Sequence, residues 1–212
     1  MNVTEYNIIA MKRYILYSLL FVSVCSFSEC FIGKCTDGNC SNGKGTFLFR
    51  NGNIYDGEFR HYMLNGTGTF TFNKGKWKGC KYTGEWKRNK INGQGTFNYV
   101  NGDIYTGHFK HNKLDGDGKY TFAEGDYKGC TYSGNWTNNK MSGYGIFLYA
   151  DGKKYEGQWK NNIKSGTGTM TFPDGSIYSG DWENGKMNGT GTFTFSNGTT
   201  LKGEWKDNEF VK

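Results

Sequence analysis

The sequence is poor in proline and has no long apolar run. Only one of its 212 residues is proline, Pro173, and its most apolar stretch, residues 14–24, spans eleven residues. A membrane-spanning helix needs about 20 apolar residues, so this stretch is too short to cross a bilayer. Apolar residues follow no helical period anywhere in residues 41–212, which argues against a fold built from amphipathic helices.

Groups that carry out catalysis or bind metals are scarce as well. The chain has three histidines, His61, His108 and His111, and we find no Ser/His/Asp grouping, phosphate-binding glycine loop or carboxylate pair in a rigid cleft. The spacing His108-x-x-His111 is a weak metal motif, which we interpret as exposed polar side chains. We therefore predict no catalytic residue, no metal site and no cofactor, and a protein that is not an enzyme.

Positive charge is not gathered into one continuous surface. The formal net charge is +7, from 26 basic and 19 acidic residues, and acids alternate with bases in segments such as Glu85 to Lys87. This argues against nucleic acid as a partner. The densest cluster could contact anionic lipid or simply be a solvated loop. Its candidate lipid contacts are Lys74, Lys76, Lys78, Lys81, Lys87 and Arg88.

Glycine and aromatic residues are abundant and form a tandem repeat. The chain has 33 glycines and 17% aromatic residues. The pattern Tyr-x-Gly-x-Trp/Phe recurs six times from Tyr55, and a divergent seventh copy begins at Leu201. Successive copies are 27, 23, 27, 23, 23 and 23 residues apart, and a second element, Gly-x-Gly-x-aromatic, lies between them. Such periodicity indicates a repeat architecture.

Each repeat is typical of two antiparallel strands. In an extended strand Tyr155, Gly157 and Trp159 share one face, and the residues between them are polar. Dipeptides such as Asn51-Gly52 and Asp151-Gly152 predict two-residue hairpin turns, and polar runs such as residues 160–165 predict the opposite turns. The predicted fold class is all-β, an elongated single-layer antiparallel β-meander, curved and twisted, with about fifteen strands.

The recurring rings have two interpretations. We expect them mainly to pack the array, lying over glycines where any Cβ would push them away. The alternative is a binding face, on which glycans would stack. The rings in question are Tyr55, Phe59, Tyr82, Trp86, Tyr105, Phe109, Tyr132, Trp136, Tyr155, Trp159, Tyr178, Trp182 and Trp205.

Two spacers carry four extra residues, and each insertion ends in a cysteine, Cys80 or Cys130. An insertion that preserves its flanking motifs belongs in a loop. The two cysteines are two repeats apart, about 19 Å in a sheet, whereas the Cα atoms of bridged cysteines lie within about 7 Å. They are therefore free or half-buried thiols, or bridges to a second chain.

The amino-terminal part differs from the array. Lys12 and Arg13 precede the apolar stretch and short residues follow it, which predicts a signal peptide in a leader of residues 1–28, starting at Met1 or Met11. An uncleaved anchor or lipidation at Cys25 are the alternatives. Residues 29–42 form a predicted cysteine-rich cap and residues 43–212 the array. The protein would then be secreted or at the cell surface or periplasm.

Export favours disulfides over metal in this cap. We predict a Cys35–Cys40 disulfide across the capping turn, where it would hold the end of the array most prone to fraying. The spacing Cys30-x4-Cys35-x4-Cys40 also resembles a zinc site, although no fourth ligand lies nearby.

The repeat, with its 23-residue period over residues 43–206, resembles the MORN repeat. The resemblance implies a module rather than an activity, because MORN arrays occur in lipid kinases, membrane-junction proteins, scaffolds and methyltransferases. We predict a non-enzymatic exported scaffold or protein-interaction module whose protein partner is unknown. The alternatives are peripheral binding to anionic phospholipid and binding of a cell-surface glycan.

Overall fold

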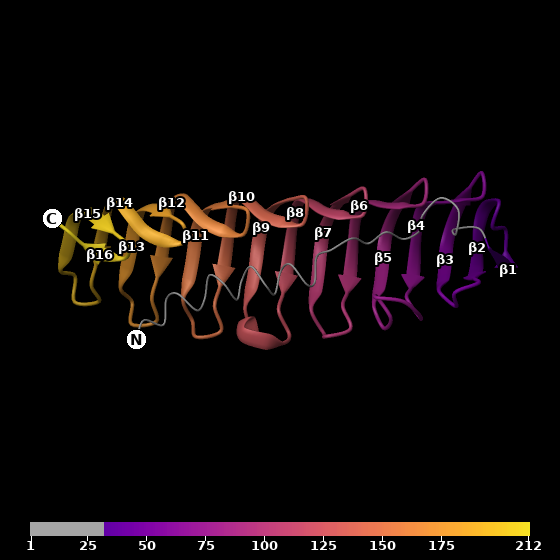
Figure 1. The fold of residues 1–212 in the computed structure, drawn as a ribbon, viewed down its shortest axis with the longest axis horizontal. Coiled ribbons are helices and arrows are strands. Elements are labelled where there is room, and N and C mark those ends of the chain that lie inside the picture. The colour runs from indigo at the N-terminus through magenta and orange to yellow at the C-terminus, as the bar shows by residue number, and fades with distance from the viewer. Residues whose placement is uncertain (1–31) are drawn as a thin grey trace.

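The computed structural model describes residues 32–212, which form one sheet of sixteen antiparallel strands in chain order. The strands lie side by side along the long axis of the molecule (Figure 1). They are β1 (Gly33–Gly38), β2 (Asn42–Phe49), β3 (Ile54–Arg60), β4 (Met63–Thr71), β5 (Lys81–Lys87), β6 (Lys90–Asn98), β7 (Ile104–Lys110), β8 (Lys113–Thr121), β9 (Thr131–Thr137), β10 (Lys140–Leu148), β11 (Lys154–Lys160), β12 (Ile163–Thr171), β13 (Ile177–Glu183), β14 (Lys186–Thr194), β15 (Thr200–Lys206) and β16 (Glu209–Phe210).

The predicted all-β, single-layer antiparallel meander is confirmed. The structure has one strand more than the expected fifteen or so, and the last of them, β16, has only two residues. The predicted leader, residues 1–28, lies outside the described residues, as do Cys25 and Cys30. Within residues 32–212, no helix is long and apolar enough to span a membrane.

The two kinds of turn are exchanged relative to the prediction. The two-residue turns lie in the predicted polar runs, for example at Asn161-Asn162, where both residues have left-handed φ angles of 52° and 71°. The rest of residues 160–165 belongs to strands. Asn51-Gly52 instead lies in a three-residue loop closed by the Phe49 N–H, which donates to the Asn53 carbonyl. The prediction of two-residue turns at the Asn-Gly and Asp-Gly dipeptides was therefore wrong.

The two-residue turns form at the asparagine pairs for a physical reason. A two-residue turn of type I′ needs positive φ at both residues, and asparagine tolerates that conformation at both positions. The three-residue loop needs it only at its last residue. Glycine fills that position, as at Gly52 with a φ of 83°.

Each tyrosine of the repeat packs directly against a glycine of the next strand. A Cβ atom built on Gly145 would overlap the Oη and ring atoms of Tyr132, and the same overlap recurs at the equivalent glycines. The hydroxyl of Tyr132 donates a hydrogen bond of 3.0 Å to the Asn135 carbonyl, three residues ahead. The expectation that glycine leaves bare backbone for the rings is confirmed. The tyrosine and glycine pairs are Tyr55/Gly68, Tyr82/Gly95, Tyr105/Gly118, Tyr132/Gly145, Tyr155/Gly168 and Tyr178/Gly191.

The rings form a continuous line along the sheet. Tyr155 makes T-shaped contacts with Trp159 of its own strand, at 5.2 Å between centroids, and with Trp182 of the next copy, at 5.1 Å. The same alternation runs from Phe59 to Phe210. Edge-to-face pairs are a favourable geometry for aromatic rings. The array is thus held by contacts between neighbouring repeats.

The amino-terminal strand β1 pairs with β2 and has only exposed residues. A disulfide joins Cys35 to Cys40, with 5.9 Å between their Cα atoms, as the sequence indicated. This bond links the outermost described strand to the segment that leads into β2.

Both insertions lie in loops, between β4 and β5 and between β8 and β9; the second includes the short 3-10 helix η1 (Gly125–Tyr127). Tyr127 packs on Phe147 at 6.0 Å, and Trp77 of the first insertion packs on a ring of β6. Cys80 and Cys130 are free and buried, and burial raises the pKa of both thiols. A thiol this buried cannot meet a second chain unless its loop opens, so the geometry favours free thiols.

Replacing Gly145 by alanine tests the contact between tyrosine and glycine. The added methyl would displace the Tyr132 ring, and overpacking of this kind costs about 1 to 3 kcal/mol. Gly175→Ala is the matched control, because its Cβ would meet open space and only its φ of 88° is strained. Urea denaturation should show a larger loss for Gly145→Ala than for Gly175→Ala. Equal losses would contradict the assignment.

Removing the disulfide should loosen only one end of the array. A bond that closes such a short loop contributes about 2 kcal/mol, and repeats interact only with their neighbours. In the double variant Cys35→Ser/Cys40→Ser, we expect faster amide hydrogen exchange in β1 and β2 and unchanged exchange from β9 to β14. A uniform increase over the whole sheet would show that the array unfolds as one unit instead.

Candidate functional site

The structure divides the predicted lipid contacts into two groups. Lys74, Lys76 and Lys78 lie in the first insertion and Lys81 begins β5, whereas Lys87 ends β5 and Arg88 lies in the turn beyond it. The two ends of β5 are about 20 Å apart at about 3.3 Å per residue. The six residues that are clustered in the sequence are therefore divided between the two opposite ends of β5.

The thirteen rings singled out from the sequence are all buried. Six of them, the repeat tyrosines, have no exposed surface. The faces of these tyrosines are covered by neighbouring rings and glycine backbone, so the tyrosines offer no surface on which a sugar could stack. Their place in the structure is in the packing of the array.

The histidines do not assemble a site either. His61 and His111 lie in two-residue turns, and His108 lies in β7, where its Nδ1 is 2.8 Å from the Asp115 carbonyl oxygen. Among residues 32–212, no three His, Cys, Asp or Glu side chains gather closely enough to hold a metal ion.

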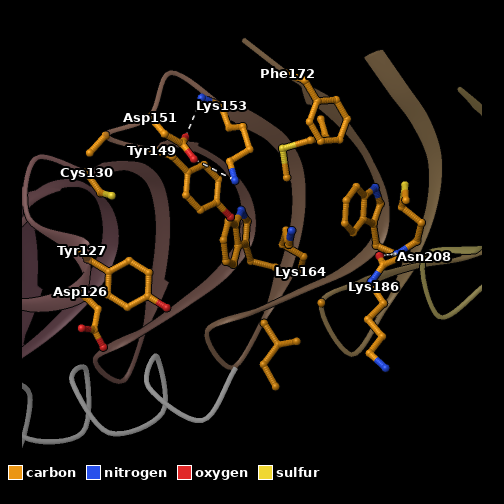
Figure 2. A pocket seen from close by; sticks show the side chains of 17 residues that line it. Asp126, Tyr127, Cys130, Tyr149, Asp151, Lys153, Lys164, Phe172, Lys186 and Asn208 are labelled. Carbon is orange, nitrogen blue, oxygen red and sulfur yellow. Dashed lines mark hydrogen bonds and ion pairs between the residues drawn. The ribbon is translucent and has the colours of Figure 1, made fainter. Parts of the chain in front are cut away.

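A cavity of about 530 Å³, here called the C-terminal hollow, opens on the ring-bearing face between the second insertion and the last repeats. Figure 2 shows Lys164 near its centre, with Lys153 and Asp151 to one side and Lys186 and Asn208 to the other. Apolar side chains of the second insertion, of the loops after β10 and β12 and of β11 to β14 complete its lining. Its volume is in the range of ligand-binding clefts.

Lys164 occupies a position that is apolar in every other repeat. It lies on β12, directly across from Trp159 on β11. These two strands form the fifth of the hairpins that begin with the Tyr-x-Gly-x-Trp/Phe strand. The residues opposite the equivalent ring in the other hairpins are Leu64, Ile91, Leu114, Met141, Met187 and Phe210. In this hairpin the usual order of a polar and then an apolar residue is reversed, as Ile163-Lys164.

The half-buried ammonium group of Lys164 lies over aromatic rings. Its Nζ is 4.3 Å from the centroid of the Trp182 ring and 5.4 Å from that of Tyr155. Within residues 32–212 it forms no ion pair with a carboxylate. Burial, followed by the like charge of Lys153, lowers the pKa of Lys164 to about 7. The cation–π contact favours the charged form and opposes this shift.

Two further replacements remove side-chain volume from the same place. Met170 stands opposite Tyr155 where the other hairpins have a ring, such as Phe147 or Phe193. Gly185 stands where other turns carry an asparagine, such as Asn162, whose Oδ1 accepts from the Met141 N–H at 2.7 Å. Both replacements line the C-terminal hollow. Both replacements therefore widen the cavity at this point of the repeat.

Lys153 is a fourth departure. In other repeats, the side chain of the residue that follows the three-residue loop accepts a hydrogen bond from the backbone N–H twenty residues later. Asp103, for example, accepts from the Ala123 N–H at 2.8 Å. The residue twenty positions after Lys153 is Pro173, which has no N–H to donate. An acceptor side chain is therefore not needed at position 153, and a lysine stands there instead. Its Nζ pairs with Asp151 at 2.9 Å and lies 5.6 Å from the Tyr149 ring.

A model of the MORN repeat matches residues 41–54, 55–77, 82–104, 105–127, 132–154, 155–177 and 178–200, over half of the chain. The chain belongs to the MORN-repeat family. The comparison with curated proteins gives no match. The C-terminal hollow is lined by residues of the last four matched MORN repeats, together with Cys130 and Asn208, which lie outside the matched ranges.

Solved structures resemble this MORN array only loosely. The TCP domain of SAS-4 (dCPAP) of Drosophila melanogaster, solved with a proline rich motif of Ana2 (dSTIL), is 15% identical over 80% of this chain and 82% of that chain, with a TM-score of 0.33. The TCP10 domain of Danio rerio CPAP is 13% identical over 81% and 88%, with a TM-score of 0.29. Virginiamycin B lyase from Staphylococcus aureus is 8% identical over 82% and 88%, with a TM-score of 0.18. TM-scores this low support no functional argument.

Sequence reasoning missed the hollow because Lys164 was interpreted as part of a polar turn. The signal was nonetheless present. Aligning the MORN copies on their tyrosines places Lys164 in a column of Leu, Ile, Met and Phe. Only the correct turn, Asn161-Asn162, shows that this column faces the rings.

Lys164→Met restores the repeat and should stabilise the array. Stabilising changes of this type add about 1 kcal/mol. Lys140→Met, which removes an exposed lysine one residue before the equivalent position in the preceding hairpin, is the control for net charge. Thermal and urea unfolding should show a gain for Lys164→Met and little change for Lys140→Met. A loss for Lys164→Met would mean that Lys164 stabilises the fold.

The gain from Lys164→Met should depend on pH. The folded-state pKa of Lys164 is lowered to about 7, whereas an unfolded lysine titrates near pH 10.4. Between these values the unfolded chain binds the proton more tightly, so the natural chain becomes more stable as the pH rises. Unfolding at several pH values should show the largest advantage of Lys164→Met below about pH 7, shrinking towards about pH 10. A constant advantage would argue against a buried cation.

Proposed function

We propose that the chain is a non-enzymatic, exported interaction module that binds an extended segment of a protein partner in the C-terminal hollow. The observation that carries the proposal is the coincidence of four departures from the repeat in one cavity. Lys153, Lys164, Met170 and Gly185 all line it. Natural sequences tend to break their own local rules at functional sites, and a lysine among core positions is such a break.

A protein segment suits this cavity better than a membrane does. The cations of the hollow are recessed in a concave surface, and a bilayer presents its headgroups as a plane. The six predicted lipid contacts are exposed but are divided between the two ends of β5. Anionic phospholipid therefore remains a second candidate that rests on charge alone.

Binding of a glycan through the thirteen recurring rings is less well supported. These rings are buried, and stacking on a sugar requires an accessible ring face. The hollow combines aromatic side chains with two methionines and three lysines, and this mixture of apolar and cationic groups suits the side chains of a peptide.

The array provides a preorganised frame for such binding. Hydrogen bonds from indole Nε1 atoms to glycine carbonyls hold neighbouring hairpins together, for example from Trp182 to Gly168 at 3.0 Å and from Trp205 to Gly191 at 3.2 Å. A rigid site loses little conformational entropy when a ligand binds. The Cys35–Cys40 disulfide is compatible with an oxidising compartment and supports the proposed export.

Narrowing the hollow should weaken binding. A displayed random-peptide library selected on the full chain should yield peptides that bind it, and Met170→Phe should weaken their binding about tenfold or more, because the ring takes up space that the peptide would occupy. Gly185→Asn should act in the same direction. The control is Thr167→Val, which changes an exposed side chain of the same strand. Thermal unfolding would confirm that each variant folds.

Failure of the library to yield any binder would contradict the proposed function. Binders that are insensitive to both Met170→Phe and Gly185→Asn would place the site elsewhere on the molecule. Co-sedimentation with phosphatidylserine vesicles, but no peptide binding, would favour the lipid candidate instead.

A further inference from the structure

We infer that the C-terminal hollow selects a segment that carries an acidic side chain beside an apolar one, and that Lys164 binds the carboxylate. The inference rests on the proposed function and names the chemistry of the partner.

The first step concerns the expected cost of Lys164 in folding free energy. Its position is apolar in the six other hairpins, and a cation there lacks the solvation of an exposed lysine. The replacement of a ring by Met170 would not by itself indicate a function, because one apolar side chain replaces another. A half-buried lysine without a carboxylate partner is expected to destabilise the fold, and natural sequences break a local rule in this way at functional sites. Binding of an anion would give Lys164 such a role.

The second step is the charge balance around the hollow. Lys153 is paired with Asp151, and Lys186 is paired with Asp207 at 2.9 Å. Lys164 is the lining lysine that pairs with no carboxylate of the described chain. The other lining carboxylate, Asp126, comes from η1 and forms no ion pair within residues 32–212. A ligand carboxylate at Lys164 would complete the missing ion pair.

The third step is the apolar surface beside this cation. Met170, Met187 and Phe172 line the hollow next to Lys164, and Trp182 lies beneath its ammonium group. Thioether side chains adapt to differently shaped apolar groups. The hollow therefore offers one place for a carboxylate and an adjoining place for an apolar side chain, which an acidic and an apolar residue in one extended segment would fill.

The fourth step concerns the source of the anion. A carboxylate on a flexible peptide side chain can enter a recess of about 530 Å³, together with its apolar neighbour. A phosphate of an intact bilayer stays in the headgroup plane. The geometry thus favours the carboxylate of a peptide over the phosphate of a membrane.

A double-mutant cycle tests the inference. The full chain and Lys164→Met are each titrated, by isothermal calorimetry, with a library-selected peptide and with the same peptide in which its Glu or Asp is replaced by Gln or Asn. We expect the amide replacement to weaken binding to the natural chain about tenfold or more and to have little effect on Lys164→Met. Lys140→Met should behave like the natural chain. Thermal unfolding of Lys164→Met verifies that it folds.

The outcomes separate this inference from the proposed function. Selected peptides without an acidic residue, or an equal effect of the amide replacement on both proteins, would overturn the inference and leave peptide binding intact. Absence of any peptide binder would overturn the proposed function and the inference with it. Binding of phosphatidylserine vesicles that Lys164→Met abolishes, without peptide binding, would assign the cation to lipid and also overturn it.

Discussion

The contact of a tyrosine ring with a glycine that has no side chain is the constraint on which the rest of the structure depends. In Tyr132 and Gly145 the ring occupies the space that a Cβ would need, so ring and backbone approach within van der Waals distance. This brings each tyrosine between the ring of its own strand and the ring of the next copy. Within residues 32–212, a single sheet without a second layer thereby buries its aromatic face on itself.

Much of this fold could be predicted because its rules are local. The alternation of Tyr155, Gly157 and Trp159 defines a face, and the glycine of the following strand reveals where the ring lies. The turns were harder to predict, because Asn-Gly favours positive φ in both a two-residue turn and a three-residue loop. Strand register distinguishes the two, and register depends on pairing across the whole hairpin. The error at residues 160–165 concealed that Lys164, a half-buried lysine, lies opposite Trp159.

Clustering along the sequence was also a poor guide to clustering in space. Lys81 and Lys87 are six residues apart, yet they begin and end the same strand. The residues that form the C-terminal hollow are instead far apart in sequence, from Asp126 to Asn208. They meet because each hairpin places its equivalent residue one step further along the sheet. A site in such an array is found by comparing equivalent positions between repeats rather than by searching for neighbouring residues.

The repeat architecture also explains how one hairpin can carry a costly residue. In a globular core, an ammonium group at a central position would disturb packing on every side. Here each hairpin contacts mainly its two neighbours, so the cost of Lys164 is confined to the fifth and sixth hairpins and the other repeats keep their full contacts. The same confinement accounts for the position of the hollow. Met170 and Gly185 reduce side-chain volume in the same part of the sheet in which Lys164 interrupts the apolar column.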